Sequence, residues 1–239
     1  MKLVIIRHGE PDYEHDSLTE KGRREAEFLA ERLVKTPADY YYVSPLGRAR
    51  ATAAPTLERL GREEVVLPWL REFAARVVRP DDDDIPWDLM PGYWTKEPRY
   101  YDRDHWYDTE IMRSGDVKGE YLRVTGELDQ LLAKHGYVRN GGYYRAVRPN
   151  TDTIVLFCHF AVETVFISHL LGVSPVPLWH GTCAQASSVT TLVTEEREEG
   201  IAFFRMLNFG DVSHLTENGE EPSFMARFCE VYTDFSQQH

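Results

Sequence analysis

The stretch LVIIRHGE, residues 3–10, decides the fold of this chain. Its first four residues are apolar and three of them are β-branched, which is typical of a strand buried on both faces of a sheet. The run stops at Arg7, His8 and Gly9, which places a cation and an imidazole at the carboxyl edge of that strand. Open α/β sheets bind their ligands at this edge. We therefore predict that His8 is the centre of a site, as a nucleophile that attacks a phosphoryl group.

The composition indicates a globular chain with one large domain. Its 239 residues are 42% hydrophobic, which suffices for a core. The three cysteines (Cys158, Cys183 and Cys229) are few, odd in number and widely spaced, which favours a reducing compartment and a cytoplasmic protein. Without a CxxC pair, no structural zinc site is expected. The first apolar run is too short for a signal peptide or a membrane span, so no membrane partner is expected.

The net charge of −12 argues against nucleic acid as a partner, because phosphate backbones need a basic face. The same acidity repels an anionic substrate at long range. Any phosphate site in this chain must therefore be a local cluster of cations.

The order of the predicted elements defines an α/β fold, because strands alternate with helices along most of the chain. We expect a three-layer sandwich with a mostly parallel central sheet, helices on both faces, and an inserted cap over the carboxyl edge. The sequence predicts strands at 3–6, 40–43, 65–67, 153–158, 188–195 and 201–207, a hairpin at 137–144, and helices near 19–33, 46–60, 120–134 and 160–171.

Residues 1–239 are expected to form a single domain in which 77–150 is a cap or insertion region. The first part of this region is rich in proline, tryptophan and tyrosine and has little periodicity, which indicates short helices and loops. An equally good interpretation is a satellite cluster that only covers the sheet.

Five residues in separate motifs are expected to converge on the edge of the sheet. Two predicted strands end in His8 and His159, and neighbouring loops supply Arg7, Arg48 and Glu72. Phosphoryl transfer needs such a set, because cations and N–H donors must surround the negatively charged group. A nitrogen nucleophile can accept the group covalently, and a nearby acid can protonate the leaving oxygen.

The motifs that contain these residues resemble those of the histidine phosphatase superfamily, in its phosphoglycerate mutase-like branch. The resemblance covers residues 1–75 and 150–210 and is weak in between. The motifs are RHGE at 7–10, LTEKG at 18–22, SPLGRARATA at 44–53, LRE at 70–72 and CH at 158–159.

The resemblance implies a role for each of these residues. His8 would carry the phosphoryl group as a phosphohistidine, and Arg7, Arg48 and His159 would hold its oxygens. Glu72 would protonate the leaving oxygen and then deprotonate the water that hydrolyses the intermediate. No metal or other cofactor is implied, and the expected partner is a small phosphorylated substrate.

Two departures from the family pattern affect the prediction. Phe160 stands where the family often has glycine, so its backbone N–H could still point at the phosphate while its ring narrows the pocket. Mutase members carry Ser or Thr and then Asn in the loop where this chain has EPDY at 10–13. Carboxylates there disfavour a second phosphate, so a hydrolase of a phosphomonoester is favoured over a mutase.

Other interpretations stay open at the level of sequence. The chain could be a phosphomutase of the same fold or a non-catalytic phospholigand-binding protein. A metal-dependent hydrolase is a further alternative, since His159 and Glu163 lie four residues apart and could join His8 and His180 around an ion. His180 and Glu10 could border the pocket or serve only the structure, and Cys158 is most simply a core thiol.

Overall fold

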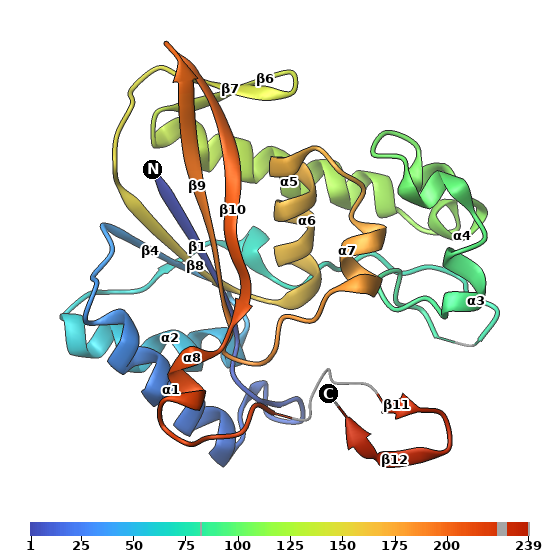
Figure 1. Ribbon diagram of the computed structural model, residues 1–239, viewed down its shortest axis with the longest axis horizontal. Coiled ribbons are helices and arrows are strands. Elements are labelled where there is room, and N and C mark those ends of the chain that lie inside the picture. Colours follow the sequence, from blue (N-terminus) through green and yellow to red (C-terminus); the bar gives the residue numbers. More distant parts are fainter. Residues whose placement is uncertain (82, 224–228, 239) are drawn as a thin grey trace.

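The computed structural model describes residues 1–81, 83–223 and 229–238. Its centre is an eight-stranded sheet with the strand order β5-β4-β8-β1-β9-β10-β7-β6, flanked by helices on both faces (Figure 1). The predicted α/β sandwich with helices on both faces is therefore confirmed. The sheet is mixed, with three parallel and four antiparallel strand pairings, because two hairpins extend the parallel half.

The four strands that lead to the candidate site are parallel. Strand β1 (Lys2–Arg7) pairs with β8 (Thr153–Cys158), and β8 pairs with β4 (Tyr40–Val43). The other edge of β4 pairs with β5 (Val65–Val66). Arg7 lies opposite Cys158 in the β1–β8 register, so the two residues that follow, His8 and His159, leave the sheet side by side.

The other half of the sheet is antiparallel. It adds four strands to the free edge of β1: β9 (Val189–Glu198), β10 (Ile201–Asp211), β7 (Tyr143–Ala146) and β6 (Tyr137–Asn140). The hairpin predicted at 137–144 is the β6–β7 pair, and Gly141 in its turn has a φ of 58°. Left-handed backbone of this kind favours glycine.

Strand β1 is buried on both faces because its side chains alternate between two cores. Leu3 and Ile5 pack into the core beneath α5 (Val117–Lys134) and α6 (Phe160–Leu171). Val4 and Ile6 pack into the core beneath α1 (Glu20–Leu33) and α2 (Gly47–Leu60). Figure 1 shows these two helix pairs on opposite sides of the sheet.

The helix ends follow the sequence signals. The side chain of Thr19 accepts a hydrogen bond from the N–H of Gly22 and caps α1, as predicted. Gly61 and Gly172 end α2 and α6 with φ values of 61° and 69°, where residues with a Cβ would be strained.

The segment 77–150 divides into two parts, which corrects the expected extent of the cap. Residues 77–81 and 83–116 hold loops and short helices, whereas residue 82 lies outside the described residues. Helix α5 and the β6–β7 hairpin belong to the main body, because Leu128 and Leu132 pack in the core and Tyr144 pairs with Ala202 of β10. The short elements are α3 (Pro91–Trp94), η2 (Pro98–Tyr101), η3 (Trp106–Asp108) and α4 (Glu110–Arg113).

The remaining described elements are short, and most of them lie at the periphery. They are β2 (Pro11–Asp12), β3 (Ser17–Leu18), η1 (Pro68–Leu70), α7 (Val176–Gly181), α8 (Ser213–Thr216), β11 (Cys229–Val231) and β12 (Asp234–Gln238).

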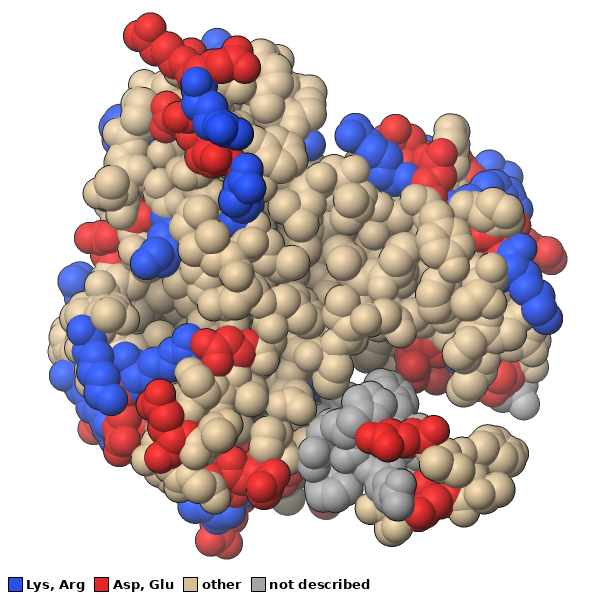
Figure 2. All heavy atoms as spheres, viewed as in Figure 1, with Lys and Arg blue, Asp and Glu red and all other residues tan. Residues whose placement is uncertain are grey.

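The surface carries charges of both signs. Figure 2 shows acidic and basic side chains intermingled on the viewed face, without a broad basic area. No helix in the described parts of the chain has the length and apolar character needed to cross a membrane.

Candidate active site

His8 lies buried at the end of β1, and its environment keeps the imidazole neutral. Its Nδ1 is 2.7 Å from the carbonyl oxygen of Gly9. Because a carbonyl only accepts, Nδ1 carries the proton and Nε2 keeps its lone pair. Burial and the charge of Arg7, with a smaller contribution from Arg48, hold the pKa of His8 well below its usual value. A neutral imidazole with a free Nε2 can act as a nucleophile.

His159 lies beside His8, as the β1–β8 register requires. The two ring centroids are 5.1 Å apart, and Nε2 of His159 is 2.7 Å from the hydroxyl of Ser44. The other ring nitrogen, Nδ1, is buried without a hydrogen-bond partner among the described residues. Burial, followed by the charges of His8 and the two arginines, lowers the pKa of His159 well below its usual value. Because Nδ1 has no hydrogen-bond partner among the described residues, it is available to an anion held at His8.

Arg7 and Arg48 bring two guanidinium groups to the same place. Arg7 donates from Nη1 to the carbonyl of Ala184, and Arg48 donates from Nη1 to the carboxylate of Asp16 over 2.8 Å. The Nε atom of each arginine is buried without a partner among the described residues. Such buried donors need an acceptor, which the oxygens of a phosphoryl group can supply.

Two positioning residues were not predicted from the sequence. Asp16 accepts the backbone N–H of Gly47 over 2.7 Å as well as the Arg48 guanidinium. Thr52 accepts the N–H of Gly9 over 2.9 Å and donates to the carbonyl of Arg48 over 2.8 Å. Thr52 therefore ties the first motif to the third, and Asp16 fixes the direction of Arg48. Asp16 lies in an acidic loop, where no sequence signal distinguishes it. Thr52 lies inside the SPLGRARATA motif at 44–53.

Glu72 reaches the site from the loop after η1. Its carboxylate accepts backbone N–H groups of Phe73 over 2.9 Å, Val162 over 3.0 Å and Ala161 over 3.4 Å. Burial raises the pKa of Glu72, although these hydrogen bonds and the charge of Arg7 oppose the rise. A raised pKa favours the protonated form of the carboxyl group, from which it can donate a proton.

The start of α6 differs from the expectation. The N–H groups of Ala161 and Val162 are directed at Glu72, so this helix start positions the carboxyl group. The ring of Phe160 lines the pocket, and the Arg7 guanidinium lies 5.7 Å from its centroid. A phosphate contact from the backbone N–H of Phe160 stays a prediction.

Glu163, on the first turn of α6, is a further buried carboxyl group. It is 1% exposed, and neither of its oxygens has a well-aligned hydrogen-bond partner among the described residues. Burial raises its pKa to about 8, with the nearby Thr190 hydroxyl and the charge of Arg7 opposing the rise and Glu72 adding to it. The site thus has a second buried carboxyl group close to Arg7, which the sequence suggested only as a metal ligand.

The structure does not bring His8, His159, Glu163 and His180 together as metal ligands. His180 donates from Nδ1 to the carbonyl of Val176 over 2.7 Å and accepts the N–H of Leu89 at Nε2 over 2.8 Å. No three His, Cys, Asp or Glu side chains gather with metal-binding geometry among the described residues. His180 therefore has a structural role.

Glu10 is likewise engaged away from the pocket. It accepts hydrogen bonds from the hydroxyls of Thr19 and Ser223. Neither Glu10 nor His180 lines the cavity that contains His8.

The candidate site opens into a cavity of about 660 Å³. Arg7, His8, Arg48 and Glu72 line one end of it, and His159 is fully buried behind them. Apolar side chains cover much of the remaining wall, namely Tyr13, Leu46, Phe73, Trp87, Phe160 and Trp179. The cavity thus combines a cationic cluster at the edge of the sheet with a largely apolar wall elsewhere.

Together these features define an α/β protein with a candidate anion site, centred on His8, at the carboxyl edge of the parallel half of the sheet. Residues 3–86, which include Arg7, His8, Arg48 and Glu72, match the family model described as histidine phosphatase superfamily (branch 1). The resemblance to the histidine phosphatase superfamily is thereby confirmed over residues 3–86.

Similar proteins extend the likeness beyond the matched segment. Phosphoserine phosphatase 1 of Hydrogenobacter thermophilus is 23% identical over 211 residues, which cover 82% of this chain and 89% of that protein. The adenosylcobalamin/alpha-ribazole phosphatase of Salmonella typhi is 23% identical over 220 residues, which cover 87% and 96%. The crystal structure of a phosphoserine phosphatase mutant from Entamoeba histolytica, in complex with phosphoserine, superposes with a TM-score of 0.58 at 20% identity, covering 90% of this chain and 98% of that one.

Proposed function

We propose that this protein is a phosphatase that hydrolyses a phosphomonoester without a metal ion, through a phosphohistidine intermediate on His8. The observation that carries the proposal is the neutral His8 imidazole among Arg7, Arg48 and His159, with the carboxyl group of Glu72 beside them. The similar proteins named as phosphatases support the reaction class.

The proposed reaction has two steps. In the first, Nε2 of His8 attacks phosphorus, the bond from phosphorus to the leaving oxygen breaks, and Glu72 donates its proton to that oxygen. In the second, the Glu72 carboxylate takes a proton from water, the water oxygen attacks phosphorus, and the bond to His8 breaks to release inorganic phosphate. The arginines and His159 stabilise the charge on the phosphoryl oxygens in both steps.

Hydrolysis should be unaffected by chelators, since cationic side chains supply the positive charge. We expect release of inorganic phosphate from p-nitrophenyl phosphate at the same rate with and without millimolar EDTA. Loss of the rate in EDTA, with recovery on adding a divalent cation, would support the metal-dependent alternative. Phosphate binding without turnover on a broad substrate panel would support a non-catalytic phospholigand-binding protein.

Product analysis separates the hydrolase from the phosphomutase. A hydrolase yields only the alcohol and free phosphate, whereas a mutase transfers the group between two hydroxyls and is stimulated by a bisphosphate.

The cytoplasmic location and the absence of nucleic acid and membrane partners stay predictions.

Replacing Glu72 by glutamine should affect poor leaving groups most. The amide oxygen can still accept the N–H groups of Phe73 and Val162, but the side chain cannot donate a proton to a leaving alkoxide. We expect kcat/KM for an alkyl phosphate to fall about 10²–10⁴-fold, and much less for p-nitrophenyl phosphate, whose leaving group needs no proton. Glu64→Gln, at an exposed pair with Arg50, is the control. An equal loss on both substrates would contradict proton donation by Glu72.

A further inference from the structure

The cavity is much larger than a phosphate site requires. Its volume of about 660 Å³ lies in the middle of the range of roughly 300–1,000 Å³ that is typical of sites for drug-sized ligands. The phosphoryl group would occupy only the end lined by Arg7, His8 and Arg48. A small organic part, such as that of O-phosphoserine, would leave most of the remaining volume unfilled.

Four aromatic side chains from separate parts of the chain line the cavity beyond the proposed phosphoryl position. Phe73 follows Glu72, Trp87 comes from the cap segment 77–116, and Phe160 and Trp179 come from α6 and α7. Phe73 and Trp179 are each 3% exposed, and their ring centroids are 5.6 Å apart. They form a fixed wall.

The polar atom of Trp179 does not face a ligand, since its Nε1 donates to the carbonyl of Ala161 over 3.2 Å. Trp87 and Phe160 are only partly buried, so part of each ring remains accessible. The accessible ring surface in this part of the cavity therefore comes mainly from Trp87 and Phe160.

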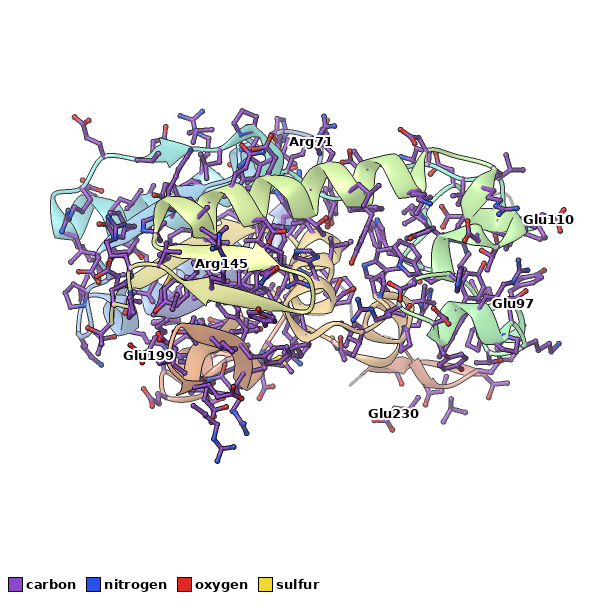
Figure 3. The ribbon with its side chains drawn as sticks, turned by 90° about the horizontal axis from the view of Figure 1, so that it is seen from above. Arg71, Glu97, Glu110, Arg145, Glu199 and Glu230 are labelled. Carbon is purple, nitrogen blue, oxygen red and sulfur yellow. The ribbon has the colours of Figure 1, made fainter. Side chains whose placement is uncertain are left out.

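The charged side chains in this part of the cavity do not form a second anion site in the wall. Arg76 pairs with Asp84 over 2.9 Å, and both side chains are more than half exposed. Arg71 is half exposed, and Figure 3 shows it beside α5, where Glu120 lies 3.9 Å away. Asp88 also lines the cavity, and burial raises the pKa of its carboxyl group. Among the described residues, the most buried cations of the lining are therefore Arg7 and Arg48 at the proposed phosphoryl position.

We propose that the organic part of the substrate is an aromatic ring system that packs against these rings, and that Trp87 determines this specificity. The proposal rests on the proposed phosphatase function and names the substrate class for the same site. An aromatic ring gains from burial and from ring–ring contact, whereas a short polar hydroxy acid gains neither.

The test compares two alkyl phosphates with leaving alcohols of similar acidity, 2-(1-naphthyl)ethyl phosphate and ethyl phosphate. Because the bond that breaks is of the same kind in both, a difference reports on binding of the ring. We expect kcat/KM to be at least about tenfold higher for the naphthyl compound, mainly through a lower KM. O-phosphoserine should behave like ethyl phosphate.

Two tryptophan variants in the same cap segment locate the effect. Trp87→Leu should raise KM for the naphthyl compound by about tenfold and leave ethyl phosphate nearly unchanged. Trp94→Leu is the matched control, since Trp94 packs on the same core and stacks on His180 but does not line the cavity. It should leave the preference of the wild type in place.

The outcomes separate the two proposals. Hydrolysis of neither compound, with p-nitrophenyl phosphate also intact, would overturn the phosphatase function itself. Hydrolysis of both at equal kcat/KM would overturn the substrate class alone. An equal loss of preference in Trp87→Leu and Trp94→Leu would overturn the role of Trp87.

Discussion

Replacing His8 by alanine should lower kcat for p-nitrophenyl phosphate by about 10⁴-fold or more, because the variant has no atom that can accept the phosphoryl group. The remaining groups can still bind phosphate, since Arg7 and Arg48 keep their contacts with Ala184 and Asp16. We therefore expect KM, or the Kd for inorganic phosphate, to change far less than kcat. Steady-state turnover and isothermal titration with phosphate measure the two effects separately.

The phosphoenzyme gives a second measurement of the same prediction. Wild-type protein quenched in alkali during turnover of a labelled substrate should carry an alkali-stable, acid-labile phosphoryl group, and the His8→Ala protein should carry none. His105→Ala, at an exposed histidine of the cap segment, is the control and should behave as wild type. Turnover by His8→Ala within tenfold of wild type would refute the nucleophile.

Replacing Glu163 by glutamine should stabilise the protein at alkaline pH, on the order of 5 kcal/mol in the free energy of unfolding. In the unfolded chain this carboxyl group loses its proton near pH 4.3, as glutamate ordinarily does. In the folded protein its pKa is raised to about 8, because it is buried at 1% exposure. The folded state therefore binds more protons between these values, and wild-type stability falls as pH rises through the interval. Glutamine cannot ionise and avoids that loss.

Urea unfolding at pH 5 and pH 8.5 checks the sign of this effect. The two proteins should differ little at pH 5, where glutamine replaces a protonated carboxyl group of nearly the same shape. The difference should grow to its full value at pH 8.5. Glu198→Gln, at an exposed end of β9, should show no comparable pH-dependent gain. Destabilisation of Glu163→Gln by the same amount at both pH values would mean that Glu163 is an anion paired with Arg7.

The two effects concern the same part of the molecule. Glu163 and Glu72 both face Arg7, which also stands beside His8. A protonated Glu163 leaves the Arg7 charge available to the proposed phosphoryl group, whereas an ionised one would compete for it. The stability measured with Glu163→Gln therefore reports on the electrostatics of the candidate site.

Local patterns in the sequence were sufficient to predict the secondary-structure elements and the motif residues that meet at the candidate site. The apolar run at 3–6 gave a strand with two buried faces because alternate side chains must enter different cores. Thr19 and Gly61 marked helix ends because backbone donors and acceptors there need specific partners or dihedral angles. These are short-range rules that a single sequence contains.

Local patterns could not predict the C-terminal boundary of the cap. Helix α5 has the same periodicity whether it covers a sheet or a separate cap, and the β6–β7 hairpin has the same turn whether or not it joins the sheet. The choice depends on the pairing of Tyr144 with Ala202, which lies far along the chain.

By itself the sequence determined the family resemblance, the α/β elements and the identity of the motif residues, because each depends on neighbours within one element. Only the tertiary structure decided that Asp16 holds Arg48, that the start of α6 binds Glu72, and that Glu163 is buried close to Arg7. The Glu72–Val162 contact joins residues 90 positions apart. Contacts at such separations follow from strand order and helix packing, which no local pattern encodes.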